Sequence, residues 1–362
     1  MSFDLWRRLA IQPPRAVEPP AGSARLRLQP EDFEVHEELG FAASGQGEHV
    51  LLQVRKRLAN TAWVARELAR IAGVRHFDVG YAGLKDRNAV TTQWFTVPSR
   101  RRDPASWIGT GGEGYEVIAA TAHARKLPRG ALAGNRFRIV LRDFVGEAAQ
   151  LERRVAAIAV AGVPNYFGPQ RFGRDLGNLR GVFDDATADA TADAAADAAA
   201  PERGFELSAL RSLLFNAVLA ARVARADWCR LQLGERANLD GSNSSFVVQA
   251  LDESIATRLA ALDIHPTGPL YGRGESGVTG DVAALEAEVI AGFPQVAARL
   301  QRDRLEASRR PLRVAVRDLE LSWIDSSTPV LSFRLRPGSF ATTVLRELID
   351  VAAAVGSEDE HD

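Results

Sequence analysis

YAGLKDRNAVTTQW, residues 81–94, places one carboxylate, Asp86, between two cations, Lys85 and Arg87. The flanking residues 77–81 and 90–97 are rich in β-branched and aromatic side chains, so we predict a turn over 83–88 between two strands. An acid presented at such a turn is a candidate nucleophile. The same pattern is also typical of a solvated hairpin turn, because turns favour Gly, Asp and Asn for conformational reasons.

Longer strings elsewhere in the chain bear on this choice. Residues 164–173 read PNYFGPQRFG, and together with GYAGLKDRNAVTTQWF at 80–95 they resemble the TruD family of tRNA pseudouridine synthases. Other strings follow in the order of that family: PEDFEVHE at 30–37, GEHVLLQVRK at 47–56, RGALAGN at 129–135, PTGPLYGRG at 266–274 and RPGSFATTVLREL at 336–348. The resemblance covers roughly residues 24 to 350. It implies an isomerase that converts uridine to pseudouridine in the D arm of tRNA, at position 13.

The order of predicted elements indicates a discontinuous domain. Apolar residues at helical spacing predict helices over 61–73, 207–228 and 341–354, and strands are expected at 312–323 and 330–335. The Asp86 loop and the last two strands would then share one domain, interrupted by a mainly helical segment. The resemblance implies an α+β fold: a catalytic domain of residues 1–160 and 311–362 with a mixed, largely antiparallel sheet, and an inserted α/β TRUD domain at 161–310.

Composition is that of a globular protein with packed cores. The 362 residues and their 46% hydrophobic content predict two or three domains. Apolar runs fall short of the 18 or more residues of a membrane span and the N-terminus lacks a signal-peptide core, so we expect a cytoplasmic protein without a membrane partner. We also expect a monomer whose partner is its tRNA substrate.

Cysteine and histidine content argues against a metal site. Cys229 is the one cysteine and the six histidines show no metal-ligand spacing. We therefore predict neither a metal nor a cofactor.

The formal net charge of −1 conceals an uneven distribution. The low-complexity segment 184–200, expected to be a surface loop, holds five aspartates, and the tail 357–362 holds four acids. Without these nine acids the rest of the chain has a formal charge of +8. Basic runs at 99–102, 125–129 and 309–313 are candidate phosphate contacts if they converge, although each run alone is typical of a solvated surface.

The implied reaction requires little more than one ionised carboxylate. It breaks the N1–C1′ bond of a uridine and forms a C5–C1′ bond, with no oxidation and no water consumed. Asp86 could attack C1′, attack C6 or remove the 2′ proton, and the sequence leaves these routes open. Arg27 occupies the place of a family basic residue, usually lysine, and is the predicted partner of Asp86. Lys85 is adjacent but would point away in an extended loop.

Substrate-binding residues are nominated by the resemblance. A flipped base is commonly held on aromatic rings, and the motifs suggest Phe33 and Phe340 for stacking and Asn135 for polar recognition. By periodicity alone the two phenylalanines would be core residues and Asn135 a turn former. Asn165 and Arg171 could either brace a domain junction or contact RNA.

Two other functions remain open on the sequence alone. A non-catalytic RNA-binding protein would not need Asp86. An N-glycosidase would release the base, and glycosidases generally use two carboxylates.

Overall fold

The computed structural model describes residues 3–187, 200–303 and 305–352. The chain forms two compact units, each described below by itself. Unit 1 comprises residues 1–19 and 160–315, and unit 2 comprises 20–159 and 316–362. The low-complexity segment expected at 184–200 lies mostly outside the described residues, since 184–187 end one helix and Ala200 begins the next.

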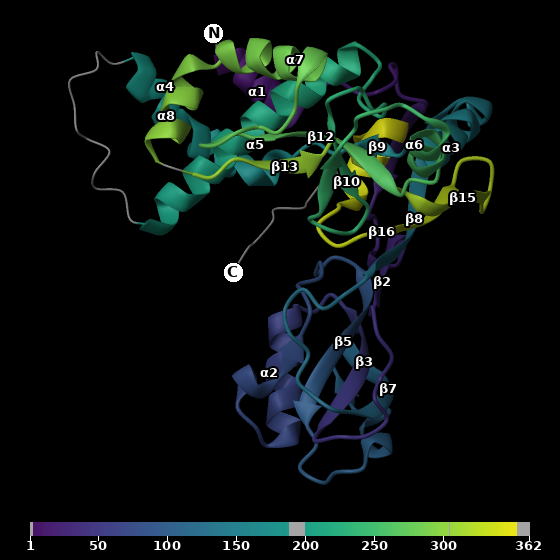
Figure 1. The fold of residues 1–362 in the computed structure, drawn as a ribbon. Helices are drawn as coiled ribbons and strands as arrows, with labels where there is room; N and C mark the ends of the chain where they lie inside the picture. The colour runs from purple at the N-terminus through teal and green to yellow at the C-terminus, as the bar shows by residue number, and fades with distance from the viewer. Residues whose placement is uncertain (1–2, 188–199, 304, 353–362) are drawn as a thin grey trace. The chain divides into compact units, whose positions relative to one another are not determined.

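Unit 2 is built on one large sheet (Figure 1). Its main strand order is β15-β16-β8-β2-β5-β3-β7-β6, and β1, β17 and β4 pair off this path. The strands are β1 Gly22–Leu26, β2 Phe33–Glu38, β3 His49–Arg57, β4 Gly80–Tyr81, β5 Val90–Pro98, β6 Gly111–Gly112, β7 Tyr115–His123, β8 Gly134–Gly146, β15 Arg317–Trp323, β16 Pro329–Leu335 and β17 Asp350–Ala352. The pairs β2–β5 and β1–β17 are parallel and the others are antiparallel. The expected α+β fold with a mixed, largely antiparallel sheet is confirmed.

Unit 2 also contains three helices in the residues that the structure describes. They are α2 Thr61–Ala72, α3 Ala148–Ala161 and α9 Ala341–Leu348, with short 3-10 turns η1 Pro30–Asp32, η2 His76–Asp78 and η3 Pro104–Trp107. In Figure 1, α2 runs beside β5 and β3, where Val64 and Leu68 pack against Val54 and Phe95 in one buried cluster. Gly73 ends α2 in the left-handed conformation, with φ of 65°. The helix predicted at 61–73 is confirmed.

The last predicted helix is too long. α9 ends at Leu348, and residues 350–352 form β17, which pairs in parallel with β1. Apolar periodicity does not distinguish these residues from another turn of helix, because their strand conformation depends on a partner more than 300 residues earlier in the chain.

Unit 1 combines helices with a small antiparallel sheet of order β11-β10-β12-β13. Its strands are β9 Val163–Pro164, β10 Arg236–Leu239, β11 Ser245–Val247, β12 Ile264–Leu270, β13 Ser308–Pro311 and β14 Arg313–Val314, where β9 pairs with β14. Its helices are α1 Phe3–Ile11, α4 Gly177–Thr187, α5 Ala200–Ala224, α6 Glu253–Ala260, α7 Gly280–Ala291 and α8 Pro294–Arg302, with turns η4 Pro169–Phe172 and η5 Arg174–Leu176.

The N-terminal residues belong to unit 1. Trp6 of α1 is 1% exposed and packs in the same buried cluster as Leu210 and Leu213 of α5. The Asn216 side chain of α5 donates a hydrogen bond to the carbonyl of Leu9 over 2.9 Å. The described part of residues 1–19, a segment expected with the catalytic segments, therefore packs with the inserted segment.

α5 is the central helix of unit 1. Residues 204–224 are long and apolar enough to cross a membrane by composition, but 67% of that stretch is buried in the protein. Such burial is typical of a core helix in a globular domain.

Candidate active site

Asp86 lies in the loop between β4 and β5 of unit 2 and forms an ion pair with Arg27. Arg27 Nη2 donates to Asp86 Oδ2 over 2.7 Å, and the Asp86 side chain is 56% exposed. A guanidinium at this distance stabilises the ionised carboxylate, which is the form that the chemistry needs. The carboxylate is thus held in one direction and is open to a substrate from solution.

Arg27 is held by its backbone and by an aromatic ring. It follows β1 directly and has φ of 59°, a left-handed conformation that costs a non-glycine residue about 1–3 kcal/mol. Its guanidinium carbon lies 4.1 Å from the ring centre of Phe33, a cation–π contact. The turn at Arg27, just past the end of β1, directs this side chain toward Asp86.

Phe33 is therefore part of the support of Arg27. The ring is 2% exposed, and its neighbour Phe137 meets it edge on at 6.1 Å between ring centres. The role of Phe33 in base stacking stays a prediction, and it would require the covering guanidinium to shift.

Lys56 holds the backbone of the Asp86 loop from within the protein. Its Nζ donates to the carbonyls of Ala59, Lys85 and Asp86 at 2.8, 3.3 and 3.0 Å, and the residue is 1% exposed. Burial lowers the pKa of Lys56 to about 8, against the opposing attraction of the Asp86 charge. Sequence reasoning missed Lys56, although it continues the inward face of β3 set by Val50, Leu52 and Val54.

Lys85 points away from its neighbour Asp86. Its Nζ lies 2.8 Å from Glu37 Oε2, and the two side chains are only 8% and 0% exposed. Burial raises the pKa of Glu37, and the Lys85 charge opposes that rise. A buried carboxylate with its own cation completes the anchoring of the loop, and Glu37 was a second residue that sequence reasoning missed.

Two uncharged side chains strap the same loop. Gln93 of β5 donates to the carbonyl of Gly83 over 2.5 Å and accepts from the Thr61 hydroxyl over 3.0 Å. The amide of Lys85 in turn donates to that hydroxyl over 3.1 Å. The loop is consequently hydrogen-bonded at Gly83 and Lys85, and through Lys56 at Asp86 itself, which limits the directions that the carboxylate can take.

Asn135 and Phe340 lie near the ends of strands in the same unit. Asn135 is the second residue of β8, opposite Glu37 of β2 and Leu335 of β16, and its side-chain oxygen is buried without a hydrogen-bond partner in the described structure. Phe340 precedes α9 and is 59% exposed. An unsatisfied buried acceptor and an exposed aromatic ring are features of binding surfaces. Their contact with a base stays a prediction.

Asn165 and Arg171 belong to unit 1. Asn165 is 8% exposed and uses both ends of its carboxamide, donating to the carbonyl of Pro311 and accepting from Arg310. Arg171 is exposed, and its Nη1 donates to Ser208 Oγ over 3.1 Å. Of the two, only Arg171 presents its polar atoms to solution.

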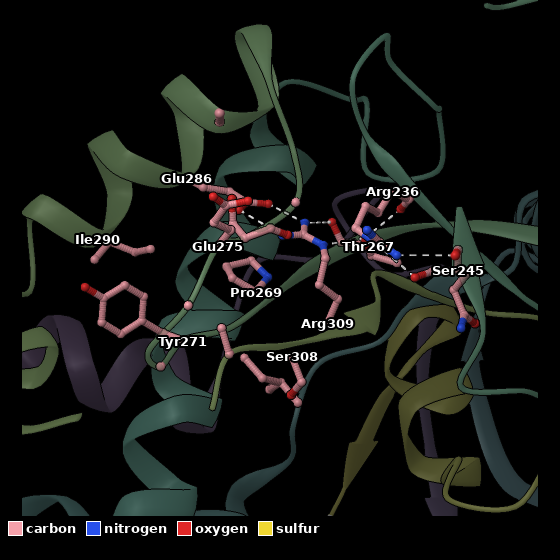
Figure 2. A pocket seen from close by; sticks show the side chains of 18 of the residues that line it. Arg236, Ser245, Thr267, Pro269, Tyr271, Glu275, Glu286, Ile290, Ser308 and Arg309 are labelled. Atoms are coloured by element: carbon pink, nitrogen blue, oxygen red, sulfur yellow. Dashed lines mark hydrogen bonds and ion pairs between the residues drawn. The ribbon is translucent and has the colours of Figure 1, made fainter. Parts of the chain in front are cut away.

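Unit 1 also contains a pocket of about 1050 Å³ between α7 and the small sheet (Figure 2). Arg309 lies in it with both terminal nitrogens on Glu286 and its Nε on Thr267. The catalytic and substrate-binding candidates nominated from the sequence do not line this pocket. Of its charged side chains, Arg309 is paired with Glu286, and Arg236 donates to Ser245.

Among the residues that the structure describes, no group of three or more His, Cys, Asp or Glu side chains could hold a metal ion.

Comparison with known proteins shows the family of this chain. The sequence pattern of the family described as tRNA pseudouridine synthase D (TruD) matches residues 16–185 and 199–348. The chain belongs to the TruD family. Enzymes of this family isomerise uridine to pseudouridine in tRNA.

Curated TruD-family relatives are similar over nearly the full chain. The tRNA pseudouridine synthase D of Nitrosococcus oceani is 47% identical over 341 residues, covering 94% of each chain. That of Methylococcus capsulatus is 47% identical over 340 residues, covering 93% of this chain and 94% of the relative.

A crystal structure from Methanosarcina mazei, provisionally described as tRNA pseudouridine synthase D, superimposes with a TM-score of 0.73. It shares 21% identity and covers 95% of this chain and 97% of its own, so it shows a shared fold.

Proposed function

We propose that this chain converts uridine 13 in the D arm of tRNA to pseudouridine, with Asp86 as the catalytic carboxylate. The observation that carries the proposal is the exposed Asp86 carboxylate, held at 2.7 Å by Arg27 on a loop tied down by buried Lys56. Arg27 engages Oδ2 and would leave Oδ1 for the substrate. Membership of the TruD family supports the substrate class.

The reaction exchanges one glycosidic bond for another. The N1–C1′ bond breaks, the uracil turns in the site, and a C5–C1′ bond forms, while N1 gains a proton and C5 loses one. Asp86 would form a transient bond at C1′ or C6, or would remove the 2′ proton and return it. In each route the carboxylate starts ionised and ends ionised, so the Arg27 ion pair serves the first and last states equally.

Base recognition would fall to residues around this loop. Phe340 offers an exposed ring for stacking, and Asn135 offers an unsatisfied buried oxygen to a polar edge of uracil. Phe33 would act beneath Arg27, and Lys85 would act through the loop that it anchors to Glu37.

The structure disfavours the glycosidase alternative. Glu37, a carboxylate in another of the family motifs, is fully buried and already paired with Lys85. Burial raises the pKa of Glu37, as expected for a carboxylate that anchors a loop from inside the protein. Hydrolysis of a glycosidic bond generally requires two carboxylates. Among the described contacts of this loop, no second exposed acid lies beside Asp86.

The test is conversion of uridine in a tRNA transcript by the full chain. Carbodiimide labelling followed by primer extension locates pseudouridine, and unchanged nucleoside mass excludes base release. Asp86→Asn should lose roughly 100-fold or more of this product formation and should still bind tRNA.

Asp143→Asn is the matched control. Asp143 is an exposed aspartate of the same unit that also pairs with an arginine, Arg25, at 3.3 Å. Product at another uridine would refute the position, base release would indicate a glycosidase, and full activity of Asp86→Asn would refute the assigned carboxylate.

We also propose that the enzyme works as a monomer in the cytoplasm. The similarity to tRNA-modifying enzymes over nearly the whole chain supports a location where tRNA is processed. Light scattering of the purified chain would test the oligomeric state.

A further inference from the structure

The three arginines of the basic run at 309–313 differ in the groups that they bind. Arg309 points into the pocket of Figure 2 and pairs with Glu286 at 2.5 Å. Arg313 is buried and donates to His265 Nδ1 and to two backbone carbonyls. Arg310 follows Arg309 on β13, so its side chain leaves the opposite face of the strand and does not share the Glu286 carboxylate.

Arg310 lies on aromatic rings. Its guanidinium carbon is 4.2 Å from the ring centre of Phe167 and 5.7 Å from that of Phe215. Its Nη2 donates to Asn165 Oδ1 over 2.7 Å, while its Nε is buried and has no hydrogen-bond partner in the described structure. The side chain is thus stacked and directed, but its donors are only partly used.

A second arginine shares the Phe167 ring. The guanidinium carbon of Arg171 is 5.2 Å from its centre, and the Arg171 side chain reaches the solvent. The hydrogen bonds of Arg171 and Arg310 within the described residues end on Ser208 and Asn165, not on a carboxylate. Two cations therefore lie beside each other with no acidic partner among the residues that the structure describes.

Such an arrangement is electrostatically costly in the free protein. Burial, together with the neighbouring Arg171 charge, lowers the pKa of Arg310 to about 10. A buried charge without a counter-ion is destabilising, and removing water from it is tolerated where an anion completes the site. Guanidinium groups bind phosphate oxygens through two parallel hydrogen bonds, and stacking on a ring presents that edge outward.

We infer that Arg171 and Arg310, both held on Phe167, form a phosphodiester-binding site for the RNA backbone, with Asn165 as a positioning residue. This inference rests on the proposed function, because tRNA is the polyanion that would supply the phosphate. Asn165 fixes Arg310 through its oxygen and the carbonyl of Pro311 through its nitrogen. Phosphate contacts set register and affinity without reading bases.

The competing explanation is that Arg310 only braces the segment 165–172. The salt dependence of tRNA binding distinguishes the two, because each lost phosphate contact lowers the slope of log Kd against log salt by about 0.9. We expect R310Q and R171Q each to weaken binding of an unmodified tRNA transcript. The excess Kd of each variant over wild type should shrink about three- to fourfold between 50 and 200 mM salt. R310K should keep the wild-type slope.

Arg258 supplies the matched control within unit 1. It also lies over an aromatic ring, Phe246 at 5.6 Å, but it pairs with Asp263 at 2.6 Å. R258Q should leave affinity and slope unchanged. Wild-type slopes in both R310Q and R171Q would overturn the inference, as would an equal loss in R258Q.

Two safeguards keep the outcome interpretable. If R310Q does not fold, the exposed R171Q still decides the matter. Pseudouridine formation by the wild-type chain is measured separately, so failure of the proposed function is distinguishable from failure of this site.

Discussion

Lys56 makes a prediction that links pH, stability and turnover. Its pKa of about 8 in the folded chain lies below the ordinary value of 10.5. At 1.36 kcal/mol per unit, burying the charged form costs about 3 kcal/mol of stability. This cost is fully present below pH 8 and disappears as Lys56 loses its proton.

The sign follows from proton binding. Between pH 8 and 10.5 the unfolded chain holds a proton on Lys56 that the folded chain has released, so the free energy of unfolding rises with pH through this window. Lys56→Met lacks this contribution. The wild type should therefore gain up to about 3 kcal/mol relative to Lys56→Met from pH 7.5 to pH 10.5.

Turnover should change in the opposite direction. Neutral Lys56 holds the carbonyls of Lys85 and Asp86 more weakly than the ammonium does, because charge-assisted hydrogen bonds are about twice as strong as neutral ones. We expect wild-type turnover to fall above pH 8 while stability increases, and Lys56→Met to be nearly inactive at every pH.

Urea denaturation at half-unit pH intervals, with turnover measured in parallel, checks both effects. Lys126→Met is the comparison, since Lys126 is exposed and also donates to a backbone carbonyl, that of Phe77. A stability difference between wild type and Lys56→Met that stays flat across the window would refute the reasoning. So would a stability difference between wild type and Lys126→Met that rises with pH by the same amount.

Three further predictions concern other parts of the chain. Asp86→Asn should lower turnover roughly 100-fold or more, the scale of a lost catalytic group, with tRNA affinity close to wild type in a filter-binding assay. Phe340→Ala should lose about 1–3 kcal/mol of substrate binding at nearly unchanged melting temperature, whereas buried Phe33→Ala should lose about 3–5 kcal/mol of stability; equal melting temperatures for the two would contradict this. Replacing residues 188–199 by a short Gly-Ser link should leave turnover within a few-fold, because the segment has no large apolar or basic side chain and closure entropy grows slowly with length; a collapse of activity would show that it is a working part of the enzyme.

Local pattern predicted much of the fold. The helix at 61–73 and the strands around Asp86 follow from apolar spacing and from Gly73, which are properties of neighbouring residues. β17 could not be predicted in the same way, since its partner β1 lies at the other end of unit 2. The placement of α1 in unit 1 depends likewise on packing against α5.

The residues of the site also differ in whether the sequence could predict them. Asp86 and Arg27 were accessible from the sequence through the family resemblance, and the structure puts them 2.7 Å apart. Lys56 and Glu37 were missed because a single charged residue in a strand does not reveal what it will face across the sheet. The lysine at an inward position of β3 was the one available signal.

The last strands of the chain complete the large sheet, and this has a consequence during protein synthesis. One edge of β8 pairs with β16, and the outer edge of β1 pairs with β17. About 180 residues separate β8 from β16, so at about 5–20 residues per second the ribosome takes about 10–40 s to deliver that partner. For this interval the nascent chain carries an open, apolar strand edge that can pair with other nascent chains. Slowed elongation or chaperone depletion should therefore reduce the yield of this enzyme through aggregation, even when the finished fold is stable.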